Sequence, residues 1–400
     1  MNPDSPGEVR SAGKLLLIVC TISFVCFFGS YMRIPIVPLF ATSLGADSVQ
    51  VGLINGAFML MAGALSIPSG LVSDRLGRRL PLLGGLLLLA GSSFLLYWSR
   101  TPLQMAGIYL LFGTGLSAFS PTLMSYVADV TPPEVLGQAY GWYTMAVYGG
   151  MTVGPAAGGF LGTALGLRPV FLVAGGLIFV MFFVALAFLP ASSAGHRGAG
   201  ARPAILPALK GLMGNRRLVA CLVATLGTCF GFGMFVTFMP LYIRSLGMHS
   251  GHVGFVFAAQ ALANALSRLP SGKLSDRVAD RSRLVAAGLA VFALALASFG
   301  LCRSVVPLMG AAAVMGVSMG VAFTAVGALI ADVVPRAQRG LAMGCYNTCV
   351  YAGMMLCAAG MGPIIREEGF RTGFFLNGVV GVAVLLLFIT LYRRPAPATA

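Results

Sequence analysis

Charged side chains are scarce in this sequence of 400 residues, of which only 9% are Asp, Glu, Lys or Arg. Histidine (3) and tryptophan (2) are rarer still. A soluble domain needs a polar surface around a limited apolar core, but here 58% of the residues are hydrophobic and the mean hydropathy is +0.91. The composition excludes an ordinary soluble protein and predicts an all-α polytopic membrane protein.

Acidic residues are especially few, and none lies in the middle of an apolar run. The eleven acids are Asp4, Glu8, Asp47, Asp74, Asp129, Glu134, Asp276, Asp280, Asp332, Glu367 and Glu368. The three histidines lie in loops or at the ends of runs, and the eight cysteines show no metal-ligand spacing. The sequence therefore predicts no metal site, no cofactor and no catalytic constellation, so the protein is not expected to be an enzyme. A proton-driven carrier usually needs a titratable group inside the membrane, and this chain offers none there.

The net charge of +15 reflects basic residues in the short loops between apolar runs. With twelve spans, the side that holds both termini carries 19 of the 26 Lys and Arg residues and the opposite loops carry 6. That distribution follows the positive-inside rule and argues against nucleic-acid binding. It predicts cytoplasmic termini in an inner or plasma membrane.

Twelve apolar segments are predicted to be helices, because an isolated span must satisfy its own backbone hydrogen bonds. The predicted spans 1 to 12 cover 15–41, 50–72, 80–99, 103–127, 138–162, 168–190, 218–242, 252–272, 284–302, 305–330, 339–364 and 372–392. The first run is expected to remain as a span because no signal-peptide cleavage site follows it. The basic stretch 191–217 is predicted to be a cytoplasmic linker between two six-helix bundles, 1–190 and 218–400.

The two halves repeat each other. Residues 68–79 read PSGLVSDRLGRR and residues 270–281 read PSGKLSDRVADR, at an offset of 202. Residues 38–45 match 240–247 at the same offset, whereas Ala128-Asp129-Val130 matches Ala331-Asp332-Val333 at 203. Two parallel halves of six spans are typical of transporters that bind substrate between the halves, near the bilayer midplane.

These features together resemble the major facilitator superfamily over nearly the whole chain. The turn that follows span 2 resembles the loop signature of that family, and the resemblance implies a cytoplasmic latch that holds the two halves together when the cavity faces outward. The simpler alternative is that these charges only fix the topology. The latch candidates are Gly70, Asp74, Arg75, Gly77, Arg78, Arg79 and Asp129, with Asp276, Arg277 and Asp332 as a second, mirrored set.

Span 5 contains glycines and a proline in the spacing of the family's antiporter signature: Gly141, Gly150, Gly154, Pro155, Gly158 and Gly159. The resemblance implies that this span seals the cavity of an exporter. Gly150, Gly154 and Gly158 share one helix face, where another backbone can approach closely. The alternative interpretation is a packing kink at Pro155 without directional meaning.

Span 4 departs from the proton-coupled exporters, which usually carry an arginine four residues before a Gly-x-Gly. Here the glycines are Gly113 and Gly115, and the arginine position is Tyr109. One charge, Arg33, lies within span 1 at a cost of at least about 2.5–3.5 kcal/mol. Either Arg33 reaches the outer interface or a carbonyl freed near Pro35, or it binds an anion or gates the cavity.

The leading prediction is a secondary active transporter that exports a small organic compound by alternating access. The alternatives are an organic-anion carrier that uses Arg33 and a nontransporting membrane sensor on the same scaffold. Its expected partners are the substrate, membrane lipid and protons or a counter-substrate, and the protein is expected to be a monomer. The substrate-cavity candidates are Arg33, Asn55, Tyr109, Gln260, Asn264, Tyr346 and Asn347.

Overall fold

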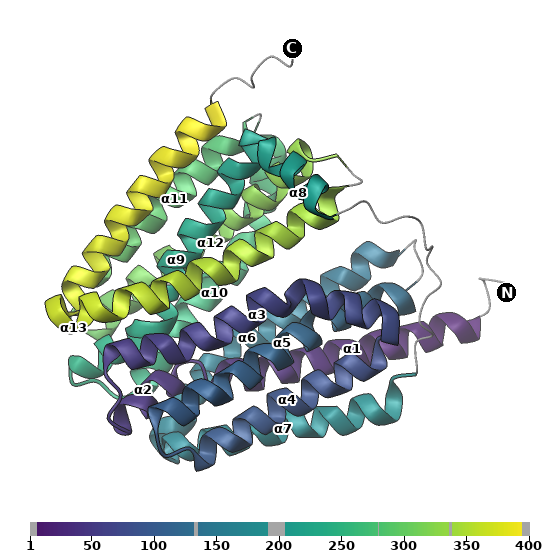
Figure 1. Cartoon of the computed structure of the whole chain (residues 1–400), viewed down its shortest axis with the longest axis horizontal. Helices are drawn as coiled ribbons and strands as arrows, with labels where there is room; N and C mark the ends of the chain where they lie inside the picture. The colour runs from purple at the N-terminus through teal and green to yellow at the C-terminus, as the bar shows by residue number, and fades with distance from the viewer. Residues whose placement is uncertain (1–5, 132–134, 191–204, 279, 336–337, 394–400) are drawn as a thin grey trace. The chain divides into compact units, whose positions relative to one another are not determined.

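The structure is a computed structural model that describes residues 6–131, 135–190, 205–278, 280–335 and 338–393 (Figure 1). Every helix or strand assigned in these ranges is an α-helix. The all-α prediction is therefore confirmed for the described chain. The first half contains α1 (Pro6–Met32), α2 (Ile36–Ser43), α3 (Ser48–Leu76), α4 (Arg79–Trp98), α5 (Pro102–Val130), α6 (Leu136–Ala164) and α7 (Leu167–Phe188).

The second half repeats this pattern after a short extra helix. It contains α8 (Ile205–Gly214), α9 (Arg216–Ser245), α10 (Ser250–Arg277), α11 (Arg281–Phe299), α12 (Val305–Val333) and α13 (Arg339–Arg393). Nine helical segments of the described chain are long and apolar enough to cross a membrane. The helices α6 and α10 are not in this set, so the count of twelve spans stays a prediction.

The chain packs as two compact units. Unit 1 contains Met1–Gly45, Leu60–Arg197 and the short segment His249–Gly254. Unit 2 contains Ala46–Met59, Gly198–Met248 and Phe255–Ala400. Two helices are therefore divided between the units, because the first turns of α3 belong to unit 2 and the first turns of α10 belong to unit 1.

Three segments differ from the predicted spans. Span 1 is broken into α1 and α2, because Pro35 and Pro38 lack the N–H groups that continue a helix. Spans 11 and 12 meet within α13 at Gly369, whose φ of 81° is not helical. The described part of the predicted linker 191–217 contains a short helix that the sequence did not predict, α8, whose Leu212 is buried. Residues 191–204 of that stretch lie outside the described chain.

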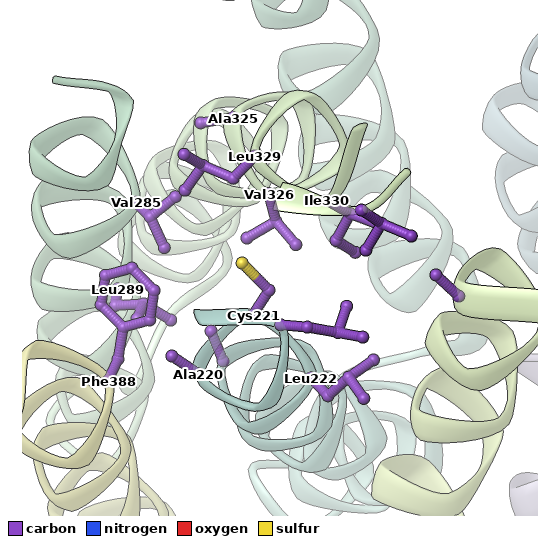
Figure 2. Close-up of a cluster of buried hydrophobic side chains, with 14 of the residues drawn as sticks. Ala220, Cys221, Leu222, Val285, Leu289, Ala325, Val326, Leu329, Ile330 and Phe388 are labelled. Atoms are coloured by element: carbon purple, nitrogen blue, oxygen red, sulfur yellow. The ribbon is translucent and has the colours of Figure 1, made fainter. Parts of the chain in front are cut away.

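Unit 2 has a hydrophobic core at one end of α9 (Figure 2). Ala220, Cys221 and Leu222 of α9 pack against side chains of α11, α12 and α13. The cluster contains Leu212, Leu218, Ala220, Cys221, Leu222, Ala224, Val285, Leu289, Ala325, Val326, Leu329, Ile330, Val334, Ala342 and Phe388. Cys221 is buried in this cluster, where it fills space as a small apolar group.

Candidate functional site

The charged turn after α3 contains an ion pair inside unit 1. Arg78 Nε lies 3.1 Å from a carboxylate oxygen of Asp129 at the end of α5, and Arg78 Nη1 donates to the hydroxyl of Ser73. The turn depends on Gly77, whose φ of 82° is rarely adopted by other residues. Arg79 opens α4 and donates from Nη2 to the carbonyl of Leu186 in α7. The turn therefore ties the ends of α3, α4, α5 and α7 together.

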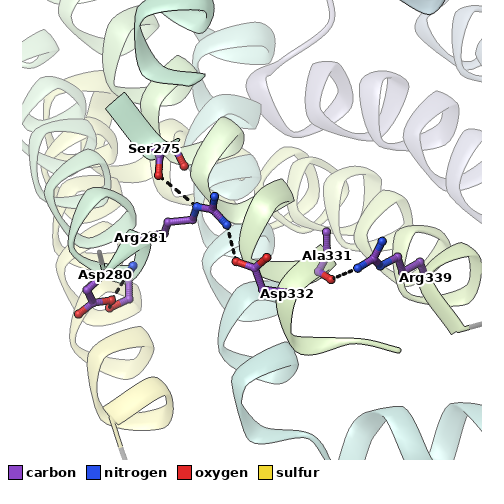
Figure 3. Close-up of polar contacts among 7 residues, drawn as sticks. Ser275, Asp280, Arg281, Ala331, Asp332 and Arg339 are labelled. Carbon is purple, nitrogen blue, oxygen red and sulfur yellow. Dashed lines mark hydrogen bonds and ion pairs between the residues drawn. The ribbon is translucent and has the colours of Figure 1, made fainter. Parts of the chain in front are cut away.

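Unit 2 contains the equivalent ion pair, between Arg281 and Asp332 (Figure 3). Arg281 Nη1 lies 2.5 Å from a carboxylate oxygen of Asp332, and Arg281 Nε donates to the carbonyl of Ser275. Asp280 caps α11, since it accepts hydrogen bonds from the backbone and the hydroxyl of Ser282. The hydroxyl bond from Ser282 is the main reason that the pKa of Asp280 lies below its usual value.

Sequence reasoning missed Arg281 as the partner of Asp332. By the offset of 202 that holds before the turn, Arg281 corresponds to Arg79 and not to Arg78. The offset becomes 203 by Asp332, so the second turn is one residue longer and Arg281 takes the place of Arg78. The change of offset was visible in the sequence and was the signal that identifies Arg281.

The remaining latch candidates are described only in part. Asp74 and Arg75 lie in the last turn of α3 and Asp276 lies in the last turn of α10, but their side chains are outside the described part, as is any contact of Gly70. Arg277 ends α10 and is exposed. The ion pair of Arg78 with Asp129 and that of Arg281 with Asp332 each join residues of the same unit. A latch between the halves remains a proposal.

The glycines of α6 lie directly against the backbone of α1. A methyl group on Gly150 would be 2.5 Å from the carbonyl oxygen of Phe24, and one on Gly154 would be 2.7 Å from that of Phe28. At Gly158 the corresponding distance, to the carbonyl oxygen of Met32, is 1.9 Å. Each step of four residues along α6 matches a step of four along α1, so the two helices run parallel with their backbones in contact.

The other signature residues of α6 have different surroundings. Pro155 is buried, and Gly141 has no atom within 4 Å of where a methyl group would be. A methyl group on Gly159 would be 2.7 Å from the carbonyl oxygen of Ser250, which is part of the α10 segment in unit 1. The hydroxyl groups of Ser250 and Thr163 are also 2.9 Å apart. α6 is therefore packed tightly on two sides, against α1 and against the start of α10.

The first part of α13 is packed in the same way within unit 2. A methyl group on Gly353 would be 2.3 Å from the carbonyl oxygen of Leu226 in α9, and one on Gly362 would be 2.9 Å from that of Ser48 in α3. The hydroxyl of Ser48 also donates to the carbonyl of Gly362. The repeat therefore preserves the packing although α13 has Cys357 where α6 has Gly154.

Arg33 lies at the end of α1 and is fully buried in unit 1. Its Nη1 donates to the hydroxyls of Ser92 (3.2 Å) and Ser93 (2.9 Å) in α4. Its guanidinium carbon lies 3.4 Å from the ring centroid of Phe112 and 5.8 Å from that of Tyr109, both in α5. Because the guanidinium is enclosed, the interpretation in which Arg33 reaches the outer interface is wrong. The structure brings Arg33 and Tyr109 together, and Ser92, Ser93 and Phe112 are partners that sequence reasoning missed.

The other cavity candidates lie in unit 2. Gln260 and Asn264 are buried between α10 and α12, where Gln260 Nε2 contacts Met319 Sδ at 3.6 Å and Asn264 Nδ2 donates to the carbonyl of Gly316. Arg268 Nε donates to the other side of the Asn264 amide, at Oδ1. Each of the two amides therefore makes a contact between the neighbouring helices α10 and α12.

Asn55, Tyr346 and Asn347 are not part of that group. Asn55 of α3 is buried. Tyr346 is half-buried beside the core cluster of unit 2, with its ring centroid 6.3 Å from that of Phe323, and Asn347 is exposed. Of the cavity candidates, Arg33 and Tyr109 therefore form one group in unit 1, whereas the others occupy separate positions in unit 2.

Comparison with known proteins agrees with this architecture. The family model described as "Major Facilitator Superfamily" matches residues 19–252 and 222–400. The chain is 30% identical to the multidrug resistance protein MdtG of Proteus mirabilis over 287 residues, which are 68% of this chain and 70% of that protein. It is 21% identical to an uncharacterized MFS-type transporter of Methanocaldococcus jannaschii, MJ1560, over 93% of this chain and 96% of that protein.

Solved structures show the same fold at low sequence identity. The nucleoside transporter NupG matches with a TM-score of 0.81 and 14% identity, over 95% of this chain and all of that one (100%). A bacterial homologue of the human lysosomal transporter Spinster matches with a TM-score of 0.80 and 16% identity, over 96% and 97% of the two chains. Family and fold are those of multi-pass membrane transporters. This chain belongs to the Major Facilitator Superfamily.

Proposed function

We propose that this protein is a secondary active transporter that exports a small organic compound across the cell membrane. Its mechanism is alternating access, in which a central site opens to one side of the membrane at a time. Its termini are cytoplasmic, as the excess of basic residues on that side predicts. The similarity to the multidrug resistance protein MdtG supports a substrate of the drug or metabolite type.

One observation carries the proposal, the backbone contact between α6 and α1. Gly150, Gly154 and Gly158 allow α6 to approach α1 so closely that no side chain fits between the two backbones. Two helices in such contact move together, so α6 transmits any displacement of α1 to the start of α10, which it contacts through Gly159. A carrier that seals one side of its cavity while the other opens needs rigid helix pairs of this kind.

The ion pairs in the turns that follow α3 and α10 support the same mechanism. Arg78 with Asp129 and Arg281 with Asp332 form equivalent ion pairs in the two turns. We propose that the neighbouring charged residues of the two turns form the cytoplasmic latch in the outward-facing state. Such charge pairs favour one of the two states of the transporter by a small free energy. A small change in their contacts is then enough to favour the other state.

Export is tested in cells that lack their own multidrug pumps. Cells that express the protein are loaded with ethidium or Hoechst dye, and the loss of fluorescence is followed after energy is restored. We expect faster loss with the wild type than with an empty vector. Gly158→Ala should abolish the difference, because the added methyl group collides with the α1 backbone, whereas Gly141→Ala is the matched control on the same helix.

The assay also separates the alternatives. Dye that accumulates on expression would contradict export and indicate uptake. Binding of dye to the purified protein without flux in cells or proteoliposomes would indicate a sensor. The organic-anion alternative predicts flux of anionic dyes only, and its proposed contact Arg33 has no exposed surface in this structure.

A further inference from the structure

The least expected side chain in the molecule is Arg33, a cation enclosed in the apolar interior of unit 1. It has no exposed surface, and the surrounding helices α1, α4 and α5 are all long and apolar. Transfer of a charged group out of water costs several kcal/mol unless other groups compensate it. The groups that stabilise the buried charge can be identified for each N–H donor of Arg33.

The Ser92 and Ser93 hydroxyls compensate only one nitrogen, Nη1. Each hydroxyl donates its own proton to the carbonyl of Leu89, at 2.9 Å for Ser92 and 3.1 Å for Ser93. Both serines therefore act as acceptors toward Arg33 and contribute no charge. No described carboxylate forms an ion pair with Arg33, in agreement with the absence of acids from the middle of every predicted span.

Phe112 compensates a different part of the group. The guanidinium carbon lies 3.4 Å from the centroid of the Phe112 ring, a favourable cation–π contact. Such a contact uses the flat face of the guanidinium, while the N–H donors point outward from its edge. Ring contact therefore lowers the cost of the charge but satisfies none of the N–H groups.

Two nitrogens of Arg33, Nε and Nη2, are buried and have no hydrogen-bond partner among the described residues. These two atoms are neighbours on one side of the guanidinium, and their N–H groups point in the same direction. That arrangement is the fork through which arginine binds an anion with two parallel hydrogen bonds. The N–H groups without an acceptor therefore lie along one edge of the positively charged guanidinium.

We propose that the Nε–Nη2 edge of Arg33 holds a small monovalent inorganic anion, for which chloride is the probe. The anion would accept both hydrogen bonds and neutralise the charge. A small occupant is required because the site is enclosed by α1, α4 and α5. The proposed anion is distinct from the exported compound of the proposed function. Its site lies next to Met32, where α1 ends, and the carbonyl of Arg33 accepts hydrogen bonds from the N–H groups of Ile36 and Val37 at the start of α2.

The test measures the thermal stability of the purified full-length protein at constant ionic strength in sodium chloride, bromide, nitrate or gluconate. We expect a saturable rise in Tm of about 1–3 °C in the small anions relative to gluconate. Arg33→Gln should remove this difference. The matched control is Arg168→Gln in the same unit, since Arg168 also lies over an aromatic ring, Phe40 at 5.3 Å, but has the carbonyl of Ser99 as a partner. That variant should keep the full anion response.

A second variant and a second measurement cover the case in which Arg33→Gln does not fold. Arg33→Lys keeps the charge but removes the two-donor fork, and it should weaken the chloride response by at least about tenfold in concentration. Anomalous scattering from a bromide-soaked crystal should show a peak beside Nε and Nη2.

Equal Tm values of the wild type in chloride and gluconate would overturn the proposal in favour of bound water. An anion response that persists in both Arg33 variants would overturn it as well, and stabilisation by acetate or benzoate but not by halides would indicate a substrate carboxylate instead. None of these readouts depends on export.

Discussion

A methyl group on Gly158 would lie 1.9 Å from the carbonyl oxygen of Met32, far inside van der Waals contact. This relationship is the closest of three along the interface of α6 and α1. It makes the glycine spacing of α6 a geometric requirement of this fold, whatever direction the transporter works in.

Substitution of the α6 glycines should lower stability in the order of these distances. Gly158→Ala should destabilise the protein by about 1–3 kcal/mol, because backbone atoms must move apart to accept the methyl group. Gly150→Ala and Gly154→Ala, at 2.5 and 2.7 Å, should have smaller effects. Thermal unfolding of the purified variants measures this order. Gly141→Ala is the control and should be neutral or slightly stabilising, since alanine favours a helix and the site is open.

The ion pair of Arg78 and Asp129 should show measurable coupling in a double-mutant cycle. With side chains 19% and 23% exposed, we expect about 0.5–1 kcal/mol of coupling between Arg78→Gln and Asp129→Asn. The pair of Arg281 and Asp332 is more exposed, at 27% and 53%, and should couple less. Purely additive effects of the two single variants would contradict coupling within that ion pair.

Asp47 should make stability depend on acidic pH. Asp47 caps α3, since its carboxylate accepts from the N–H of Gln50 while the Gln50 side chain accepts from the N–H of Asp47. The backbone bond to Gln50, followed by the contact with Arg366, lowers the pKa of Asp47 below its ordinary value of 3.8. Its stabilisation is therefore complete above pH 3.8 and is lost as the pH falls through the lower folded pKa.

The variant Asp47→Asn isolates this effect, since asparagine also caps helices but carries no charge. The difference in Tm between wild type and variant should be largest near neutral pH and should shrink below about pH 4. A difference that grows toward acidic pH would contradict the assignment. High salt should reduce only the part that comes from Arg366.

Asn264 should contribute to stability through two helices. Asn264→Leu removes the bond to the carbonyl of Gly316 and leaves Arg268 without its Oδ1 acceptor. Hydrogen bonds between membrane helices contribute about 0.6 kcal/mol on average, so we expect a loss of roughly 1 kcal/mol. Asn347→Leu, at an exposed position of the same unit, is the control. A loss of transport without loss of stability in Asn264→Leu would instead favour a direct contact with substrate.

The class of the protein follows from its composition and its hydropathy pattern. Scarce charge and long apolar runs require helices in a membrane, because only a helix satisfies its own backbone there. The repeat at an offset of 202 to 203 identified the two equivalent halves, and the spacing of four residues between glycines identified the glycine face of α6. These features are encoded in composition and spacing, so they can be read without knowledge of any long-range contact.

The contacts between side chains of different helices depend on the tertiary structure. Arg33 was a lone charge in the sequence, and its position over Phe112 and beside Ser92 and Ser93 depends on how α1, α4 and α5 are rotated about their axes. Arg281 is the equivalent of Arg78 in the second half only because the second turn is one residue longer than the first. Helix rotation and turn length are set by the sum of many small packing contacts, which no short pattern in the sequence records.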